Sequence, residues 1–192
     1  MAGTRRHGEA RDRLVATAAG LFYAEGIHAV GVDRIVDAAG VAKATMYQHF
    51  TSKDELVVAC VQLHAARWRD HVAVAARRRT GKPAERVAFV FDLLAKGFVD
   101  PAYRGCPFIN TAAEYPEPDG SVAMTIAAHR LQVRALFVEL LAPVAAARRR
   151  ECADQLLLIY DGSLVGAQHG AGAKVGRTAR RAARTLVEAA MT

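Results

Sequence analysis

Apolar residues recur at helical spacing along most of this chain of 192 residues. Between residues 11 and 25, Leu14, Ala18 and Phe22 fall on one face of a predicted helix, because positions three and four apart share a face. Gly26 follows directly and predicts the end of that helix. The chain therefore begins its regular pattern with one amphipathic helix.

Two shorter helices are predicted next, at residues 32–39 and 42–49. Ile35 and Ala39 lie on the inward face of the first of these helices. Gly40 stands between the two and supplies a backbone position that tolerates a positive φ, as a tight turn requires. This short stretch therefore predicts two helices that are joined by a tight turn.

A long helix is predicted from residue 52 to about residue 80. Ser52 is a good N-cap, and Glu55 three residues later completes a capping-box pattern. No Gly or Pro interrupts the segment before Gly81, so the helix would be about 43 Å long at ~1.5 Å per residue. It is long enough to connect two structural units, and 81–83 (Gly-Lys-Pro) predicts the boundary between them.

The remaining pattern is helical as well. Further helices are predicted at 83–99, 104–114, 121–141, 151–169 and 177–191. The glycines at 170, 172 and 176 predict a flexible connection before the last helix. Because no segment shows a clear strand alternation, the sequence predicts an all-α protein with about nine helices.

Composition and charge narrow the class of protein. The net charge is +7 and the pI is about 9.7, which favours nucleic acid or another anionic partner. Residues 1–10 are expected to form a disordered basic arm, without the apolar stretch of a secretory signal. Cys60, Cys106 and Cys152 form no metal-spaced pair, so we expect reduced thiols in a cytoplasm, no metal and no cofactor. The apolar run 56–66 is too short to span a membrane.

The helix at 42–49 has the residues that DNA reading needs. Alanines on both sides of Lys43 let the backbone approach a groove, and Lys43 can donate to a guanine edge or a phosphate. Thr45 can bind a phosphate or touch a thymine methyl group. Tyr47 and His49 lie at the far end, where they could bind the DNA backbone, and Lys53 adds a cation at the start of the next helix.

These residues resemble the tetracycline-repressor (TetR) family of transcriptional regulators. The resemblance covers residues 10–60 and rests on Ile35, Ala38-Ala39-Gly40-Val41, Thr45, Tyr47, His49-Phe50 and Ser52-Lys53-Asp54-Glu55-Leu56. It implies a three-helix helix-turn-helix DNA-binding domain at 11–57, with the fourth helix continuing as a connector to about residue 80. It also implies an effector-binding and dimerisation domain at 83–192.

Two positions depart from the family pattern. Val32 stands where many members have a capping Thr, so Gly31 or Asp33 is expected to take that task. Ala42 stands where a capping Ser is common, so the start of the reading helix is expected to be held less firmly.

The second domain contains candidates for an effector pocket, where a few polar groups would orient a largely apolar ligand. The candidates are Phe91, Phe98, Cys106, Phe108, Asn110, Glu114, Tyr115 and Met124. Cys106, Asn110 and Glu114 recur every fourth residue and so share a helical face. Ordinary core packing is the alternative for the aromatic residues, and an exposed polar stripe is the alternative for this face.

The resemblance also implies a dimer, because in this family the last two long helices pair with their copies in a four-helix interface. By position, the candidate interface residues are Leu156, Ile159, Tyr160, Ser163, Ala167, Ala183 and Leu186. A two-fold dimer of this kind reads a palindromic operator.

The sequence thus predicts a cytoplasmic, homodimeric transcriptional regulator, with repression as the expected outcome. The resemblance implies that an unidentified small-molecule effector moves the fourth helix and releases the double-stranded operator. An architectural protein that binds DNA without sequence preference is one alternative. An enzyme is another, but the seven histidines are scattered and no nucleophile motif or phosphate loop occurs, so we expect no enzymatic activity.

Overall fold

The computed structural model describes residues 2–192 and confirms the all-α class. Its elements are α1 (Ala2–Glu25), α2 (Val32–Ala39), α3 (Lys43–His49), α4 (Lys53–Trp68), η1 (Arg69–Ala73), α5 (Val74–Arg78), α6 (Pro83–Phe98), α7 (Pro107–Glu114), α8 (Ser121–Leu140), α9 (Ala146–Ala167) and α10 (Gly172–Met191). With α4, η1 and α5 counted as one continuous helical segment, these described residues form nine helices. Over the same residues, none of the helices combines the length and the apolar character that crossing a bilayer demands.

Helix α1 is longer than the pattern predicts. It begins at Ala2, so residues 2–10 form helical turns rather than the expected arm without regular structure. Met1, which also belongs to that expected arm, lies outside the described residues. The segment contains alanine, arginine and glutamate and no proline, so its composition permits a helix.

The chain divides into two compact units. The first contains residues 1–66 and 107–127, and the second contains residues 67–106 and 128–192. Helix α7 and the start of α8 are therefore grouped with α1, α2 and α3. This compact division differs from the functional division at 11–57 and 83–192, which remains a proposal.

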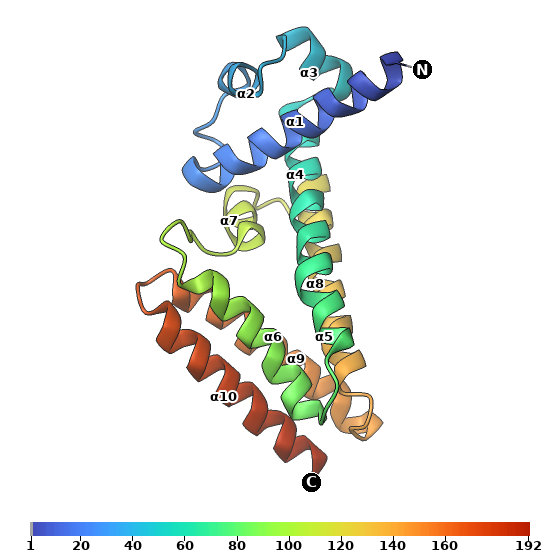
Figure 1. Cartoon of the computed structure of the whole chain (residues 1–192), viewed down its shortest axis with the longest axis vertical. Coiled ribbons are helices and arrows are strands. Elements are labelled where there is room, and N and C mark those ends of the chain that lie inside the picture. The colour runs from blue at the N-terminus through green and yellow to red at the C-terminus, as the bar shows by residue number, and fades with distance from the viewer. Residues whose placement is uncertain (1) are drawn as a thin grey trace. The chain divides into compact units, whose positions relative to one another are not determined.

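The first unit is built around α1, which packs on α2 and α3 (Figure 1). Leu14 of α1 and Ile35 of α2 are fully buried, as the apolar spacing predicts. Met46 and Phe50 bury the inner side of α3 and its end, and Leu56 anchors the first turns of α4. These contacts hold α2 and α3 against α1.

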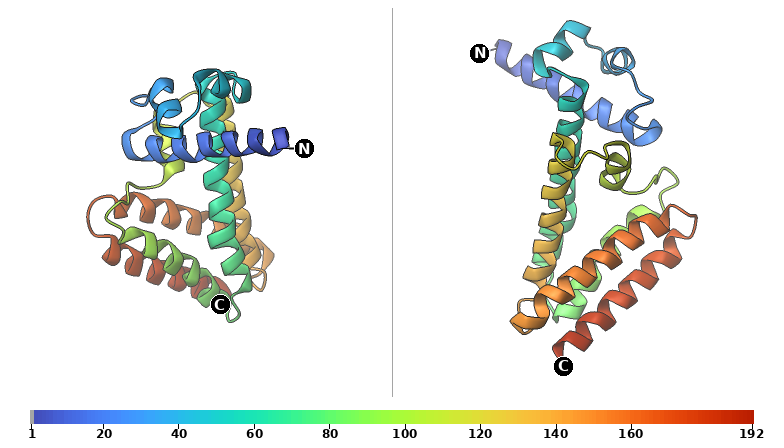
Figure 2. Two further views of the ribbon diagram at one scale, coloured as in Figure 1. Left: turned by 45° about the horizontal axis from the view of Figure 1, so that its top comes forward. Right: turned by 180° about the vertical axis from the view of Figure 1, so that it is seen from behind.

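The second unit has an aromatic core. The ring of Phe91 on α6 stacks on Phe137 of α8 with 6.2 Å between centroids. The Phe137 ring in turn meets the edge of Tyr160 from α9 at 6.1 Å. Helix α10 packs mainly on α6 and α9, and Figure 2 shows the three helices grouped together.

Two glycines lie inside α10, where the sequence predicted a flexible connection. A Cβ atom on Gly172 would lie 2.1 Å from the carbonyl oxygen of Phe98. A Cβ atom on Gly176 would lie 2.6 Å from the Cβ of Ala95. That prediction was wrong because these glycines allow α10 to approach α6 closely, and the helix begins already at Gly172.

A π-helical turn, η1, follows α4 directly. No Gly or Pro in this stretch of sequence predicts it. The Trp68 ring just before the turn meets the ring of His129 edge to face, at 5.1 Å between centroids. Such turns insert one extra residue into a helix and often accompany functional sites.

Candidate nucleic-acid interface

Gly40 joins α2 to α3 in the conformation that the sequence predicts. Its φ is 63° and its ψ is 41°, which is the left-handed region. The Gly40 amide donates to the carbonyl of Asp37 at 3.1 Å, and the Val41 amide donates to the carbonyl of Val36 at 3.0 Å. These bonds satisfy the last carbonyls of α2 and turn the chain sharply into α3.

Helix α3 turns one side inward and the other outward. Met46 is buried, whereas Lys43, Ala44 and Gln48 are exposed and Tyr47 keeps 50% of its surface accessible. The predicted outward side of the 42–49 segment is therefore accessible. Gln48 belongs to this side, although the sequence analysis did not single it out.

The other two predicted contact residues of α3 lie at the margin of its outward side. Thr45 and His49 are half-buried. The His49 ring is tilted against Phe50, with 6.3 Å between the ring centroids. Both side chains are therefore partly engaged with the protein, and only part of each is available to a partner.

Lys43 is paired across the two helices. Its Nζ atom lies 2.6 Å from Oδ1 of Asp33 in the first turn of α2, and the two side chains are 54% and 76% exposed. The hydrogen bond and the charge of Asp33 raise the pKa of Lys43 above its ordinary value. The predicted base-reading cation is thus held by a carboxylate that the sequence analysis considered only as a helix cap.

The capping pattern ahead of α4 is formed with one difference. The Ser52 hydroxyl accepts the amide of Glu55 at 3.2 Å. The Glu55 carboxylate accepts the amide of Thr51 at 2.6 Å, one residue before the position that a capping box predicts. The start of α4 is therefore secured directly after α3.

Lys53 is committed to the protein interior. It is half-buried, and its ammonium donates to the carbonyl of Ile27 at 2.6 Å. The same nitrogen lies 5.8 Å from the ring centre of Phe22. This residue, which the sequence presents as a phosphate contact, thus ties α4 to the end of α1.

The C-terminal end of α7 also contacts the residues after α1. The Glu114 carboxylate accepts the amides of Ile27 at 2.9 Å and His28 at 2.8 Å. Tyr115 donates its hydroxyl to Asp54 at 2.7 Å. Burial, followed by this hydrogen bond, raises the pKa of Tyr115 above its ordinary value.

Comparison with known proteins places these helices in a family. The family profile for bacterial regulatory proteins of the tetR family matches residues 14–60. The chain is also similar over its length to a solved TetR-family transcriptional regulator from Streptomyces coelicolor. The two are 34% identical, the match covers 96% of this chain and 97% of that one, and the TM-score is 0.89.

The chain belongs to the TetR family of transcriptional regulators.

Two curated relatives match over shorter ranges. The activator FasR of Mycolicibacterium smegmatis is 48% identical over 56 residues, which are 29% of this chain and 26% of FasR. The uncharacterised regulator YxaF of Bacillus subtilis is 27% identical over 124 residues, or 62% of this chain and 64% of YxaF. The chain thus spans less than two thirds of either curated relative. All three proteins are named as transcriptional regulators, in agreement with the non-enzymatic role expected for this TetR-family member.

The eight candidate effector residues are divided between the two compact units. Phe108, Asn110, Glu114, Tyr115 and Met124 belong to the first, and Phe91, Phe98 and Cys106 belong to the second. Met124 is 64% exposed and so does not line an interior pocket. Phe91, Phe98 and Cys106 are buried, which is compatible with the core packing that the sequence left open.

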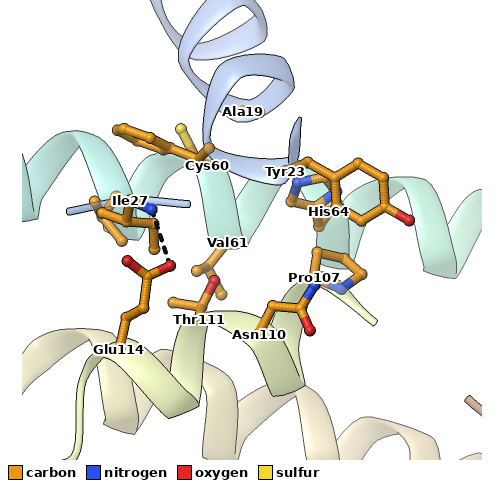
Figure 3. A pocket seen from close by; sticks show the side chains of 12 residues that line it. Ala19, Tyr23, Ile27, Cys60, Val61, His64, Pro107, Asn110, Thr111 and Glu114 are labelled. Atoms are coloured by element: carbon orange, nitrogen blue, oxygen red, sulfur yellow. Dashed lines mark hydrogen bonds between the residues drawn. The ribbon is translucent and has the colours of Figure 1, made fainter. Parts of the chain in front are cut away.

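Asn110 and Glu114 line a small pocket in the first unit, as Figure 3 shows. Its other walls are formed by α1 and by α4, including Cys60 and His64. The cavity volume is about 20 Å³, which is room for about one water molecule. Burial raises the pKa of the Cys60 thiol to about 12, so this cysteine stays protonated.

The dimer candidates separate into inner and outer positions. Leu156, Tyr160, Ala167 and Ala183 are buried within the subunit, so their side chains are covered without a partner. Leu186 is half-buried. Apolar spacing does not distinguish contacts within a subunit from contacts between subunits. Four of the candidates therefore lie on the inner side of their helices.

Ile159 and Ser163 line a groove between α9 and α10, and Ser163 is itself buried. We call it the α9–α10 groove, and it has a volume of about 490 Å³. Its lining residues are Ile159, Gly162, Ser163, Gly166, Ala171, Lys174, Val175, Thr178, Ala179 and Ala182. Leu158 on α9 is 69% exposed. Small and apolar residues of α9 and α10 therefore line this groove in the present chain.

Proposed function

We propose that this protein is a ligand-responsive transcriptional repressor that binds a palindromic operator as a homodimer in the cytoplasm. The observation that carries the proposal is the accessible outward side of α3 on a packed helix-turn-helix of a TetR-family chain. A short helix that is supported from behind and exposed in front can enter a major groove.

Specific reading is assigned to α3. Lys43 and Tyr47 lie on its accessible side, and Thr45 and His49 lie at its margin. Lys53 is kept as a supporting residue, because its ammonium is already bound to Ile27. The positive net charge adds an attraction to DNA that does not depend on sequence.

The α9–α10 groove is assigned to a second copy of this chain. Its small residues allow a neighbouring helix to approach closely, and a two-fold axis would place two grooves against each other. The dimer would hold two reading helices at the spacing of one or more turns of DNA, about 34–36 Å apart or a multiple of it.

The effector is expected to be small and largely apolar. The pocket in the first unit has room for about one water molecule, whereas drug-sized ligands fill roughly 300–1,000 Å³. Phe91, Phe98 and Cys106 in the second unit are therefore the candidate lining that we retain for it. The ligand releases DNA if it binds the non-DNA state better than the DNA-bound state.

The test is selection of fragments from the source genome by the purified protein in excess random DNA. We expect retained fragments that share one palindromic site. The variant Ala182→Arg, which puts a charge in the α9–α10 groove, should be monomeric in sedimentation and lose them. The control Ala173→Arg, on the same helix outside the lining, should behave as wild type.

Each part of the proposal can fail separately. If random DNA competes equally with every fragment, the protein is architectural rather than a specific regulator. If Ala182→Arg remains a dimer, the groove is not the interface. FasR is named as an activator, so a reporter gene behind a retained fragment decides the sign; repression is the expected result.

A further inference from the structure

Two arginine triplets, at 77–79 and 148–150, lie at the same end of the second unit. The Arg77 guanidinium at the end of α5 pairs with the Glu139 carboxylate near the end of α8, with 2.9 Å between Nε and Oε2. The central arginine of the second triplet, at the start of α9, donates to the carbonyl of Val144 at 2.8 Å. Figure 1 shows the end of α5 beside the connection between α8 and α9. These contacts bring together two triplets that are far apart in the sequence.

Each triplet contains arginines that the protein uses and arginines that it does not use. The Arg79 guanidinium, for example, lies over the ring of Phe89, 5.3 Å from its centre. Arg78, Arg148 and Arg150 are exposed, and none of the ion pairs among the described residues includes them. We call these three residues the outward arginines. They are available to a partner on one end of the second unit.

Helix stability does not explain the second triplet. It occupies the third to fifth residues of α9, and α9 has no acidic residue in its first turn. The N-cap, Ala145, provides no side-chain acceptor for the first amides. Because the backbone dipoles make the start of a helix positive, cations placed there slightly oppose the helix. The outward arginines of α9 therefore have a small electrostatic cost, which a negatively charged partner would offset.

The two units also differ in charge. Residues 1–66 and 107–127, the first unit, contain 7 Lys and Arg against 10 Asp and Glu. The second unit contains 19 Lys and Arg against 9 Asp and Glu. The net charge of +7 thus comes entirely from the second unit, whereas the unit that contains the helix-turn-helix is net negative. An attraction to polyanions that does not depend on sequence therefore originates in the second unit.

Phosphate is the chemical group that the outward arginines fit best. A guanidinium presents its donors as a planar fork that binds two oxygens of one phosphate, and duplex DNA repeats phosphates along both strands. An anionic membrane surface would also need apolar side chains among the cations. The exposed large apolar residues of the described chain include none from 77–82 or 142–151. These observations favour the backbone of duplex DNA over a lipid surface.

We propose that Arg78, Arg148 and Arg150 form a second DNA-contact surface, which binds the phosphates of duplex DNA without regard to sequence. This surface goes beyond the assignment of specific reading to α3, because it belongs to the other unit and makes no base contact. Glu151 directly follows the second triplet, so the surface keeps an excess of positive charge. Helix α3 then selects the site, and the outward arginines add affinity that falls as salt rises.

The surface is tested by fluorescence anisotropy with the full-length protein and a labelled random duplex. The triple variant Arg78→Ala/Arg148→Ala/Arg150→Ala should bind the duplex at least about fivefold more weakly at low salt. Its slope of log affinity against log salt should fall by about 2–3, since each lost phosphate contact contributes ~0.9. An unchanged affinity and slope would overturn the proposal.

A matched control removes the same charge from other exposed positions of the second unit. The variant is Lys96→Ala/Arg177→Ala/Arg181→Ala, and none of its three positions lines the α9–α10 groove. It should stay within about twofold of wild type. Equal losses in the two triple variants would show that DNA responds only to the general field, which would overturn the surface. If the first variant is not folded in urea denaturation controls, the corresponding Arg→Gln variant keeps the side-chain length and gives the same test.

Anionic vesicles decide between DNA and a lipid surface. In sedimentation with vesicles of phosphatidylglycerol and phosphatidylcholine, the wild type is expected to remain in solution. Vesicle binding that is lost with the outward arginines, together with an unchanged affinity for random DNA, would overturn the assignment to DNA.

Specific reading is measured separately from this surface. In the fragment selection, the variant without the outward arginines should retain the same palindromic fragments as wild type, because α3 is unchanged. Loss of those fragments would overturn the independence of the two surfaces. If the wild type itself retains no specific fragment, the proposed function fails, while anisotropy with random DNA still decides the role of the outward arginines.

Discussion

Gly40 in the first unit ends a helix with φ at 63°, whereas Gly176 in the second unit lies inside a helix against Ala95. Nothing lies within 4 Å of a Cβ atom built on Gly40, so this glycine is needed for backbone shape alone. At Gly176 and Gly172 the missing side chain is what matters, because another helix fills its place. The turn at Gly40 is thus specified by local geometry, and the close packing at Gly172 and Gly176 is specified by contacts between distant helices.

The largest change in the free energy of unfolding is expected for a substitution at Gly172. In Gly172→Ala the new Cβ would lie 2.1 Å from a backbone oxygen, so α10 has to shift from α6. We expect the free energy of unfolding to fall by about 1–3 kcal/mol, as for other overpacked sites. Urea denaturation at a fixed protein concentration measures it.

Gly20 provides the matched control in the first unit. It lies inside α1, and a Cβ atom there meets nothing within 4 Å. Gly20→Ala should therefore stabilise the protein by about 0.5–1 kcal/mol, because alanine loses less backbone entropy in a helix. Similar losses in both variants would mean that close helix packing is not what distinguishes the second unit.

The comparison also explains which parts of the molecule the sequence could predict. The turn at Gly40, the cap at Ser52 and the buried Ile35 depend on neighbours a few residues away, and all three were found as predicted. The close approach at Gly172 depends on Phe98, which is far away in the sequence. Spacing alone presents such a glycine as a flexible connection.

The candidate site shows the same limit. The outward side of α3 follows from helical spacing, and the structure leaves it accessible. Lys53 was expected on phosphate because it begins a helix beside the reading unit, yet Ile27 lies 26 residues earlier and binds it. The two amides that bind Glu114 are more than 80 residues away from it, and no local pattern indicates that contact.

Lys53 and Lys43 are expected to respond differently to substitution. Lys53→Ala leaves the half-buried carbonyl of Ile27 without this donor, so the free energy of unfolding should fall by about 1 kcal/mol. The slope of DNA affinity against salt concentration should stay unchanged, because the ammonium is committed to the protein. Urea denaturation and salt titration of a retained fragment give the two values.

Lys43→Ala should give the opposite pattern. Its pair with Asp33 is exposed, so stability should change little. The salt slope should fall by about 1 if Lys43 binds phosphate, or the sequence preference should relax at one operator position if it reads a base. A drop of about 1 in the slope for Lys53→Ala would instead show that Lys53 leaves Ile27 when DNA binds.

The smallest effect is expected for substitution of Asp33, as a change in the affinity for random DNA. Its carboxylate is paired with Lys43. We expect DNA to compete with this carboxylate for the lysine. Asp33→Asn should therefore raise the affinity for random DNA by about two- to threefold, in line with an exposed ion pair. Fluorescence anisotropy with a labelled random duplex is sensitive enough to measure this change.

The cycle with Lys43 separates this competition from simple charge repulsion. If Asp33 acts through Lys43, then Asp33→Asn should have no effect in a Lys43→Ala background. Asp37→Asn removes an exposed negative charge from the same helix and controls for the general field. Asp33→Asn in the wild type, Asp33→Asn in Lys43→Ala and Asp37→Asn are the three substitutions compared. If all three raise the affinity for random DNA equally, Asp33 only repels phosphate. If the gain needs Lys43, a carboxylate on α2 restrains the cation on α3 until DNA replaces it.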